Sequence, residues 1–337
     1  MTPSTERSAP PAAAPTSMRV PDFFIVGHEK CGTTSLYHIL RQHPQIFMPD
    51  TKEPRFFIPD LRKPVPGVRK RFPERQRTLE DYLSLFAGAT PEQRAGEASP
   101  QYIRSTQAAG LIAELQPAAR IIAILREPTS FLRSFHLNCV REEVETERDL
   151  RKAIALEEQR RQGKRIPRNS RSVNRLFYCE HVRYVEQLRR FDAVFPAEQM
   201  LVLIYEDFRR DNDAAVRRIL RFLEVDDTVE LEPVEASRPR KAVRLPRLHR
   251  LARAVQVARH HPAVAGRLSR TVDALTPGPL RSNAVEDRLR RMIFSVAPPL
   301  DEQFILELRG RFKPEVVALS DYLGRDLVSE WGYDGVG

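Results

Sequence analysis

Short apolar runs recur along the first two thirds of the chain, each bounded by glycine, proline or charged residues. Residues 22–27 (DFFIVG) and 121–125 (IIAIL) are uninterrupted runs, which predicts buried strands. Residues 200–205 (MLVLIY) predict a third strand, and 96–99 a fourth, shorter one. Continuous rather than alternating apolar runs are typical of a parallel sheet covered on both faces.

Helices are predicted between these strands. Residues 33–43 place Leu36, Ile39 and Leu40 at helical spacing and stop at Pro44. Further helices are predicted at about 128–143, 147–162, 172–190 and 211–223. The C-terminal third is expected to be mostly helical and to end in a helix over 314–323, with Gly324 as its C′ residue.

Strands that alternate with helices, without an internal repeat, indicate a doubly wound α/β domain. We therefore expect a P-loop-like central parallel sheet flanked by helices, with a mostly helical C-terminal part, over residues 21–333 of the 337. Residues 1–20 are mostly Pro, Ala, Ser and Thr and are expected to form a disordered lead. Residues 49–78, rich in Pro, Arg and Lys, are expected to form a long loop that could cover a site.

Charge is distributed unevenly. The net charge is +10, but residues 237–291 hold fourteen Lys or Arg against three acidic residues, and the remainder is nearly neutral. A localised basic segment favours an anionic ligand or surface over a uniformly basic nucleic-acid coat. No nucleic-acid partner is therefore expected.

A basic amphipathic helix is predicted inside this segment. Its arginines recur every three residues with leucines alongside: Arg244, Arg247, Arg250, Arg253, Leu245, Leu248 and Leu251. Such a helix is either a solvated face packed on the domain or a patch for an anionic acceptor or lipid headgroups. Residues 244–259 are thus a candidate for peripheral contact with an anionic membrane.

Hydropathy and cysteine content bear on the cellular setting. No apolar run approaches the roughly 18 residues of a membrane-spanning helix, and the N-terminus has no apolar core of a secretory signal. Cys31, Cys139 and Cys179 are too few and too scattered for a disulfide framework or a zinc site. A reducing, cytoplasmic setting is the simplest expectation.

The sharpest chemical signal is GHEKCGTT, residues 27–34, between the first predicted strand and the first predicted helix. A glycine-rich turn at this place directs backbone N–H groups and the positive end of a helix toward an anion, and the Thr hydroxyls add donors. A Walker A loop is similar, but its lysine follows the second glycine. In this chain Thr33 follows that glycine, and the lysine, Lys30, precedes it.

A cation stands where nucleotide triphosphatases place a metal-binding carboxylate. Those enzymes hold Mg²⁺ partly through an Asp at the end of a later strand, whereas the 121–125 strand runs into Arg126. At the carboxyl end of a strand, where open α/β sheets bind ligands, this arginine favours direct contact with another anion and no metal. Ser134 falls about two turns into the next helix and could face the same anion.

A series of motifs follows the chain in order. They are PDFFIVG (21–27), KCGTTSL (30–36), HP (43–44), KEPRFF (52–57), GEASPQY (96–102), LREP (125–128) with Ser134, YEDF (205–208), SRPRK (237–241) and LSDYLGRDL (319–327) with Trp331. In this order the chain resembles the sulfotransferases that use 3′-phosphoadenosine 5′-phosphosulfate (PAPS). The resemblance is to the carbohydrate type, related to the heparan sulfate enzymes and to many bacterial homologues.

The resemblance implies roles for individual residues. In the 5′-phosphosulfate loop, Lys30 would contact the phosphate and the bridging oxygen, and the surrounding residues would be Cys31, Gly32, Thr33, Thr34 and Ser35. Arg126 and Ser134 match the 3′-phosphate pair. Glu53 lies where the heparan-type enzymes have their catalytic carboxylate. Residues 237–241 resemble a late loop over the nucleotide, so the candidate phosphate contacts there are Arg238, Arg240 and Lys241.

Some positions depart from the family pattern or need an assignment. Phe131 stands where a second arginine is usual, with Arg133 two residues on, and Ala98 stands where a lysine is common. Glu97 is therefore open between an acceptor contact and a structural role at a strand end. The remaining candidates are expected to be structural: His28 as a solvent-facing loop side chain, Cys31 as a non-nucleophilic loop thiol despite its place at a helix start, Trp331 as a docking anchor, and His136, Cys139 and Cys179 as packing or surface residues.

The expected reaction is in-line transfer of the sulfuryl group from PAPS to an acceptor hydroxyl, leaving 3′,5′-adenosine bisphosphate. Glu53 would act as general base, and Lys30 would stabilise charge on the bridging oxygen of the leaving nucleotide. The acceptor is expected to be a carbohydrate or another small molecule. The alternatives are a nucleotide kinase or other P-loop NTPase, which the displaced lysine and the missing Asp disfavour, and a basic protein that binds nucleic acid or a membrane surface.

Overall fold

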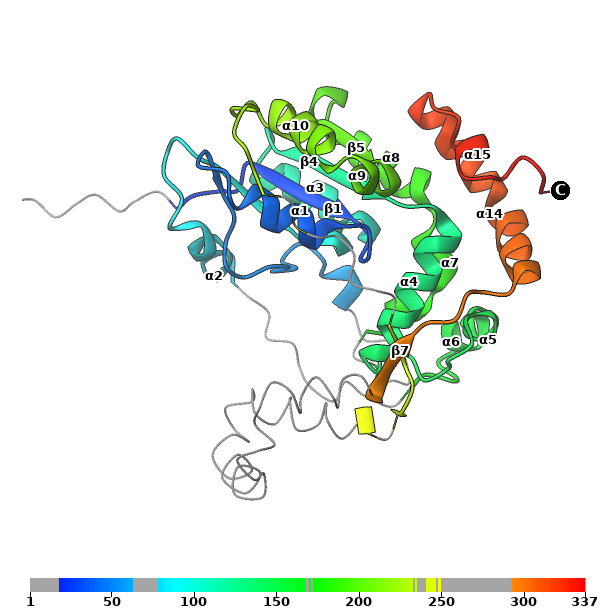
Figure 1. Cartoon of the computed structure of the whole chain (residues 1–337). Helices are drawn as coiled ribbons and strands as arrows, with labels where there is room; N and C mark the ends of the chain where they lie inside the picture. The colour runs from blue at the N-terminus through cyan, green and yellow to red at the C-terminus, as the bar shows by residue number, and fades with distance from the viewer. Residues whose placement is uncertain are drawn as a thin grey trace, which may run out of the picture.

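The fold is built on a five-stranded sheet with the strand order β2-β3-β1-β4-β5 (Figure 1). The computed structural model describes residues 18–62, 78–167, 170, 172–232, 234, 241–246, 248–249 and 292–336. The strands are β1 (Phe23–Gly27), β2 (Ile46–Phe47), β3 (Arg94–Ala98), β4 (Arg120–Leu125) and β5 (Met200–Ile204). Every pairing among them is parallel, which confirms the predicted sheet.

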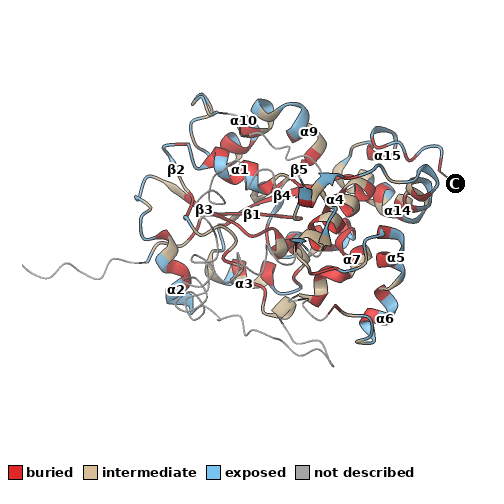
Figure 2. Ribbon diagram, turned by 60° about the horizontal axis from the view of Figure 1, so that its bottom comes forward, coloured by how far each residue is buried: buried red, intermediate tan, exposed pale blue. Residues whose placement is uncertain are grey.

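The sheet is the centre of the core. All five residues of β1 are buried, and so are Ile121–Leu125 of β4. Figure 2 shows the sheet edge-on with α1 and α10 on one side and α3 on the other, so both faces are covered. This double burial explains why β1 and residues 121–125 of β4 are apolar at every position, since each fully buried Ile, Leu or Phe side chain contributes about 1.5–3 kcal/mol.

Helices lie at the predicted places 33–43, 128–143 and 211–223, whereas the helices over 79–83, 108–115 and 205–210 were not predicted. The helices of the first two thirds are α1 (Thr33–Leu40), α2 (Leu79–Leu83), α3 (Ala108–Leu115), α4 (Pro128–Arg141), α5 (Leu150–Ala155), α6 (Glu157–Arg161), α7 (Tyr178–His181), α8 (Tyr184–Asp192), α9 (Tyr205–Arg210) and α10 (Asn212–Phe222). Short 3-10 turns lie between them: η1 (Asp60–Arg62), η2 (Ser84–Phe86), η3 (Pro100–Arg104), η4 (Val173–Leu176) and η5 (Ala197–Gln199).

The two long helices predicted at 147–162 and 172–190 are wrong as continuous elements. The first is divided into α5 and α6, and the second into η4, α7 and α8. Tertiary polar contacts fix these breaks: Arg160 forms a buried ion pair with Glu145, and Arg175 of η4 reaches Glu29 and Glu142. Such contacts override local helix propensity because leaving a buried charge unpaired costs several kcal/mol.

The C-terminal part contains α14 (Glu302–Leu323) and α15 (Leu327–Glu330). Gly324 ends α14 in the left-handed conformation, with φ 60°, as predicted. The helix begins twelve residues earlier than predicted and contains Pro314; Asp301 caps its start by accepting a hydrogen bond of 3.0 Å from Phe304 N. Among the described residues, no helix is both long and apolar enough to cross a membrane.

A small antiparallel pair departs from the mostly helical expectation for this part. β6 (Lys241–Val243) pairs with β7 (Phe294–Val296). Each strand is too short to show an alternating pattern, and about fifty residues separate the two, so no turn signal links them. Residues 1–17 of the expected disordered lead and 63–77 of the expected loop lie outside the described residues. Arg19, near the end of the expected lead, is ordered: it donates hydrogen bonds to Asp22 and to the Gln93 carbonyl.

Candidate functional site

The segment between β1 and α1 turns sharply at two glycines. Gly27 has φ 132°, and a Cβ on it would lie 2.6 Å from the Ile124 carbonyl oxygen. Gly32 has φ 88° and occupies the N-cap of α1, where no side chain of the described residues caps the helix. The first N–H groups of α1 therefore have no capping partner and point outward at the positive end of the helix. This arrangement suits an anion.

Lys30 belongs to a group of cations at this turn. Its side chain is exposed, and no hydrogen bond or ion pair joins its ammonium to a described residue. The surrounding protein partly desolvates the ammonium, and the positive charges of Arg141 and Arg126 add to this effect, so the pKa of Lys30 is lowered from its usual value. An anion bound among these three cations would relieve their mutual repulsion.

Neighbouring elements hold the turn in place. Arg175 of η4 contacts Glu29 at 2.6 Å, and Gln101 of η3 donates a hydrogen bond of 2.9 Å to the same carboxylate. His28 is buried, and its Nε2 lies 2.8 Å from Gln187 Oε1 of α8. These contacts tie the loop to three separate elements.

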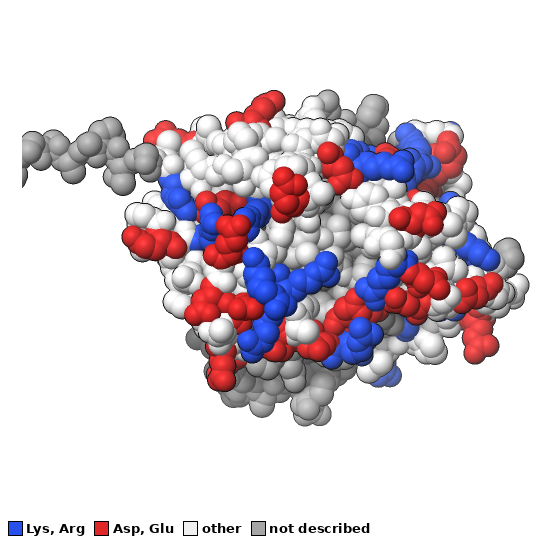
Figure 3. All heavy atoms as spheres, turned by 90° about the horizontal axis from the view of Figure 1, so that it is seen from above, with Lys and Arg blue, Asp and Glu red and all other residues white. Residues whose placement is uncertain are grey.

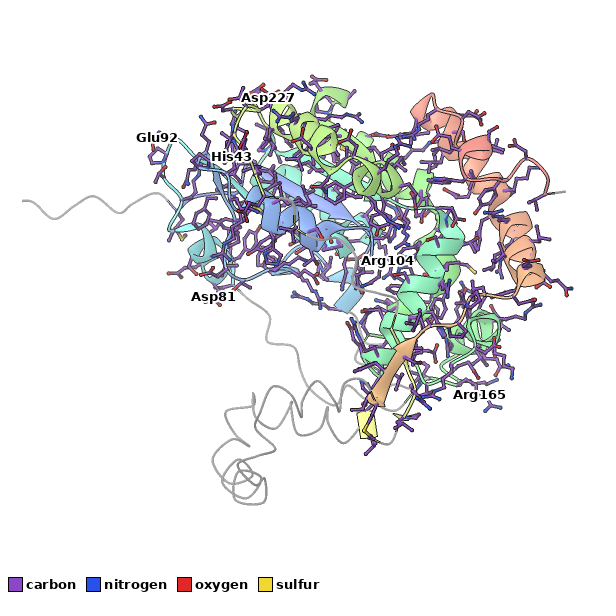
Figure 4. All side chains as sticks on the ribbon, in the orientation of Figure 1. His43, Asp81, Glu92, Arg104, Arg165 and Asp227 are labelled. Carbon is purple, nitrogen blue, oxygen red and sulfur yellow. The ribbon has the colours of Figure 1, made fainter. Side chains whose placement is uncertain are left out.

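The expectation that His28 faces solvent is wrong. The side chain is 1% exposed, and burial, together with the positive charge of Arg104, lowers the pKa of His28 to about 3. His43 lies away from Arg104 in Figure 4, and its Nε2 contacts the Asp226 carbonyl at 2.8 Å. His28 is therefore a neutral packing residue of the loop, and His43 of the HP motif fastens the other end of α1.

Cys31 turns inward as well. The thiol is completely buried and burial raises its pKa to about 12, although Arg126 and Lys30 oppose the shift. A position at a helix start can lower the pKa of a thiol and make it reactive, but the sulfur of Cys31 lies in the core, where this effect is outweighed by burial. Cys139 is also buried and has a raised pKa, and burial raises the pKa of the half-buried Cys179 to about 12. His136 and Trp331 are buried too.

Arg126 connects the end of β4 to the loop. Its Nη1 donates a hydrogen bond of 2.9 Å to the Lys30 carbonyl, and its guanidinium lies 4.4 Å from the centre of the Tyr205 ring. Its Nη2 and Nε donate to Ser130 Oγ at 2.7 and 3.1 Å. Ser134 lies one turn beyond Ser130 on the same face of α4 and is buried.

Two residues near Arg126 escaped the sequence analysis. Ser130 is its hydrogen-bond partner, and the signal would have been its position four residues after the arginine, at the start of the following helix. Glu206 Oε1 lies 4.0 Å from Arg126 Nε, and burial raises the pKa of Glu206. This carboxylate follows Tyr205 in the YEDF motif, so the motif contributes more than an aromatic ring to the site.

Glu53 lies in the loop after β2, between two cations. It contacts Lys52 Nζ at 2.7 Å and Arg55 Nη2 at 2.5 Å. Burial alone would raise the pKa of Glu53, but the two cations outweigh it and lower the pKa, so the carboxylate is ionised at neutral pH. The positive charge of Arg55 is also close enough to Glu29 for the two to interact. This brings Glu53 and the loop to the same edge, at the carboxyl ends of β1 and β3.

Glu97, the second carboxylate, lies inside the protein. It is completely buried at the end of β3, and burial raises its pKa to about 8. Ser99 Oγ donates a hydrogen bond of 3.3 Å to its Oε2. Of the two alternatives for Glu97, this burial favours the structural role over direct contact with an acceptor.

Several predicted residues cannot be placed. Arg238, Arg240 and most of 244–259 lie outside the described residues, and Lys241 is described only as a backbone position of β6. On the face shown in Figure 3, Lys and Arg side chains are interspersed with Asp and Glu, as expected for the nearly neutral remainder of the chain. Within the described ranges, no three His, Cys, Asp or Glu residues gather in a way that could hold a metal ion.

The start of α1 without a side-chain cap, the strand-end arginine Arg126 and the lysine Lys30 lie at one edge of a parallel sheet, an arrangement suited to binding an anion. The model of the sulfotransferase family matches residues 21–229. The chain therefore belongs to the sulfotransferase family of transferases, as its motifs predicted.

Relatives and solved structures agree with this membership. Human carbohydrate sulfotransferase 15 is 35% identical over 159 residues, which cover 35% of this chain and 27% of that protein. Human bifunctional heparan sulfate N-deacetylase/N-sulfotransferase 3 is 26% identical over 217 residues, 61% of this chain and 22% of that protein. The chain thus spans about a quarter of the length of these curated relatives. A sulfotransferase structure from Alicyclobacillus acidocaldarius matches with a TM-score of 0.62 and 26% identity, covering 92% of this chain and 98% of that one.

Proposed function

We propose that the protein transfers a sulfuryl group from PAPS to an acceptor hydroxyl, with Glu53 as general base and no metal ion. The observation that carries this proposal is that cations and an ionised carboxylate follow strands of one parallel sheet at the same edge. Lys30 follows β1 and Arg126 follows β4, and the loop of the ionised Glu53 is bonded through Arg55 N to Ser99, which follows β3.

The residues of the loop fit a nucleotide with anionic groups at two positions. The N–H groups at the start of α1, the side chains of Thr33, Thr34 and Ser35, and Lys30 would hold the 5′-phosphosulfate. Arg126 with Ser130 and Ser134 would hold the 3′-phosphate, and we extend this to Arg238, Arg240 and Lys241 of the late segment. When bound, PAPS supplies an activated sulfuryl group on an anhydride oxygen.

The chain's own groups would then handle one proton and one developing charge. Glu53 would accept the proton of the acceptor hydroxyl, a role that requires the ionised form it has at neutral pH. Lys30 and the loop amides would stabilise the negative charge that grows on the bridging oxygen as its bond to sulfur breaks. The Lys52 and Arg55 side chains would orient Glu53 while leaving it a weak enough base to release the proton afterwards.

We infer the chemical class of the acceptor from the names of similar proteins, and not from the shape of a binding pocket. Two proteins with similar sequences are named for carbohydrate and heparan sulfate substrates, so we propose a carbohydrate hydroxyl as the first acceptor to try. Other small hydroxyl compounds are the second choice. The cytoplasmic setting and the membrane contact through 244–259 stay predictions.

The test is a sulfuryl-transfer assay with labelled PAPS against sugars, phenols and lipids, with and without EDTA. Glu53→Gln should lower turnover about 10²–10⁴-fold and leave the affinity for 3′,5′-adenosine bisphosphate unchanged by calorimetry. Glu92→Gln, at an exposed residue labelled in Figure 4, is the matched control and should change neither. Tight binding of Mg·ATP without uptake of the bisphosphate would instead support the NTPase alternative.

A further inference from the structure

Three hydroxyl groups surround the buried carboxyl of Glu97. Ser99 Oγ donates to Oε2 at 3.3 Å. Tyr82 of α2 and Tyr102 of η3 lie close enough for burial and the carboxyl of Glu97 to raise their pKa well above the usual value. In the part of the chain that the structure describes, no Lys, Arg or His forms a salt bridge with Glu97. The carboxyl therefore lies in a polar but uncharged cluster.

The same hydroxyls also hold the backbone of the Glu53 loop. Ser99 Oγ accepts a hydrogen bond of 3.1 Å from Arg55 N, and Tyr102 Oη accepts one of 2.9 Å from Phe56 N. Because each oxygen is an acceptor for the loop, its own proton is directed toward another acceptor, and Glu97 lies beside both. Two relays thus run from consecutive loop amides through hydroxyls to one carboxyl.

The loop needs such support because its backbone is strained. Glu53 has φ 58° and Arg55 has φ 56°, in the left-handed region that residues with a Cβ rarely occupy. Each such residue costs of order 1 kcal/mol and persists only where surrounding contacts fix it. The amides of Arg55 and Phe56, immediately after Glu53, are the ones held by the two relays.

The surroundings of Glu97 favour its neutral form. An ionised carboxylate without a cation is costly in a fully buried site, and the negative charge of Glu53 adds to this cost. Glu97 Oε1 and Tyr82 Oη each lack a well-aligned hydrogen-bond partner among the described residues. A proton on Oε1 gives that oxygen a donor for Tyr82 and leaves Oε2 to accept from Ser99.

We propose that Glu97 is a positioning residue for Glu53: as the neutral acid it accepts the hydroxyl relays that fix the loop carrying the base. It does not touch the acceptor. This inference rests on the proposed function, because it assigns Glu97 a task only if Glu53 is the base. The surroundings of the two carboxyls would then keep Glu53 ionised and Glu97 neutral.

The central experiment compares Glu97→Gln with Glu97→Ala. The Gln amide keeps a carbonyl acceptor and an N–H donor, so it should retain kcat within about threefold. The Ala variant removes both relays and should lower kcat at least tenfold while KM for PAPS and the affinity for 3′,5′-adenosine bisphosphate stay unchanged. Ser99→Ala and Tyr102→Phe each cut one relay and should show smaller losses of the same kind.

Glu157→Ala is the matched control. Glu157 is also buried with a pKa raised by burial, and it accepts a hydrogen bond from Cys179 N, but it contacts none of the Glu53 loop. Its loss should lower stability and leave kcat unchanged. If Glu97→Ala does not fold, the Gln, Ser99 and Tyr102 variants decide the question alone.

A second readout does not depend on turnover. The pKa of Glu97 is about 8 in the folded protein and about 4.3 in an unfolded chain. Between these values the folded state keeps a proton that the unfolded state releases, so stability falls as pH rises. This group should increase the unfolding constant up to tenfold per pH unit. In Glu97→Gln that part of the slope should disappear, as urea unfolding at pH 5.5 and 7.5 would show.

The outcomes separate the two proposals. Absence of turnover in the wild-type protein, or an unaffected Glu53→Gln variant, overturns the proposed function and this inference together. A working enzyme in which Glu97→Ala keeps full kcat, or in which Gln is as damaging as Ala, overturns only the inference. An unchanged pH slope in Glu97→Gln rejects the neutral acid.

Discussion

Lys30 and Glu53 carry opposite charges, and neighbouring residues prepare each for its proposed role. Partial desolvation and the positive charges of Arg141 and Arg126 lower the pKa of Lys30, with Glu142 and Glu29 opposing the shift, so a bound anion would stabilise the ammonium. Lys52 and Arg55 surround Glu53, which keeps it ionised in spite of burial. Adjacent cations thus affect both groups. They destabilise the ammonium of Lys30, which has the same charge, and stabilise the carboxylate of Glu53, which has the opposite charge.

Replacing Lys30 tests the first half of this arrangement. Lys30→Met keeps the apolar stem and removes the ammonium, so the charge on the bridging oxygen loses a stabilising partner. We expect kcat to fall about 10²–10³-fold, with stability unchanged or slightly increased because repulsion with Arg141 and Arg126 is relieved. Single-turnover kinetics and urea unfolding would measure the two effects. Lys152→Met, at an exposed position of α5, is the control and should leave turnover unchanged.

The identity of the loop residues was predictable, but the direction of their side chains was not. The glycines, Lys30 and the helix start follow from spacing, because backbone N–H groups at a helix start point outward whatever the side chains are. His28 and Cys31 lie in the same loop and were expected at the surface or beside the helix amides, yet both point into the core. A loop with irregular φ values has no period from which an inward or outward direction could be read.

At the scale of elements, the junction between β1 and α1 depends on a left-handed glycine at the helix start. Gly32 has φ 88°, and a Cβ there would approach the Phe208 and Tyr205 rings at 3.2–3.3 Å. Gly324 has a comparable φ of 60° at the end of α14, but no atom lies within 4 Å of the Cβ position. The two glycines thus share a backbone conformation and differ in their surroundings.

This pair separates backbone strain from damage to the site. Gly32→Ala and Gly324→Ala should each cost roughly 1–2 kcal/mol of stability through the left-handed backbone. Only Gly32→Ala should also weaken binding of 3′,5′-adenosine bisphosphate, by at least tenfold, because the new methyl group displaces the loop against buried Phe208. Urea unfolding and calorimetry measure the two quantities; equal bisphosphate affinities in both variants would contradict a binding role for the turn.

Elements were predictable where one local pattern determined them. The strands β1, β4 and β5 and the helices α1, α4 and α10 follow from uninterrupted or periodic runs. The two-residue β2 and the β6–β7 pair are too short for a pattern. The broken helices before β5 depend on ion pairs with residues far along the chain, such as Arg175 with Glu29, and no local window contains both partners.

At the scale of the whole molecule, the C-terminal segment packs against the start of α4. Tyr333 Oη donates a hydrogen bond of 2.7 Å to Glu127 Oε1. Glu127 in turn caps α4 by accepting from Thr129 N and Ser130 N. Arg325 forms an ion pair with Asp207 of α9. In Figure 1 α14 and α15 lie beside the domain rather than in its sheet, so they support the site from outside.

Removing the tyrosine hydroxyl tests this support. Tyr333→Phe should cost about 1.5–3 kcal/mol, because a buried hydrogen bond to a carboxylate is lost. Tyr322→Phe is the matched control: its hydroxyl bonds Asp192 at 2.8 Å on the exposed surface, so we expect a loss below about 1 kcal/mol. Urea unfolding of both variants gives the comparison, and equal losses would show that Glu127 does not depend on Tyr333.

The family match ends at residue 229, whereas Tyr333 reaches back to the carboxylate that starts α4. A homologue recognised only by the motifs within residues 21–229 would have the loop residues that we propose hold the nucleotide, whereas the contact between Tyr333 and Glu127 lies beyond that match. A protein with the same motifs and a different C-terminal segment needs another hydrogen-bond donor for the carboxylate at the position of Glu127. Comparing that donor among homologues would separate proteins that keep the whole support of α4 from proteins that keep only the N-terminal motifs.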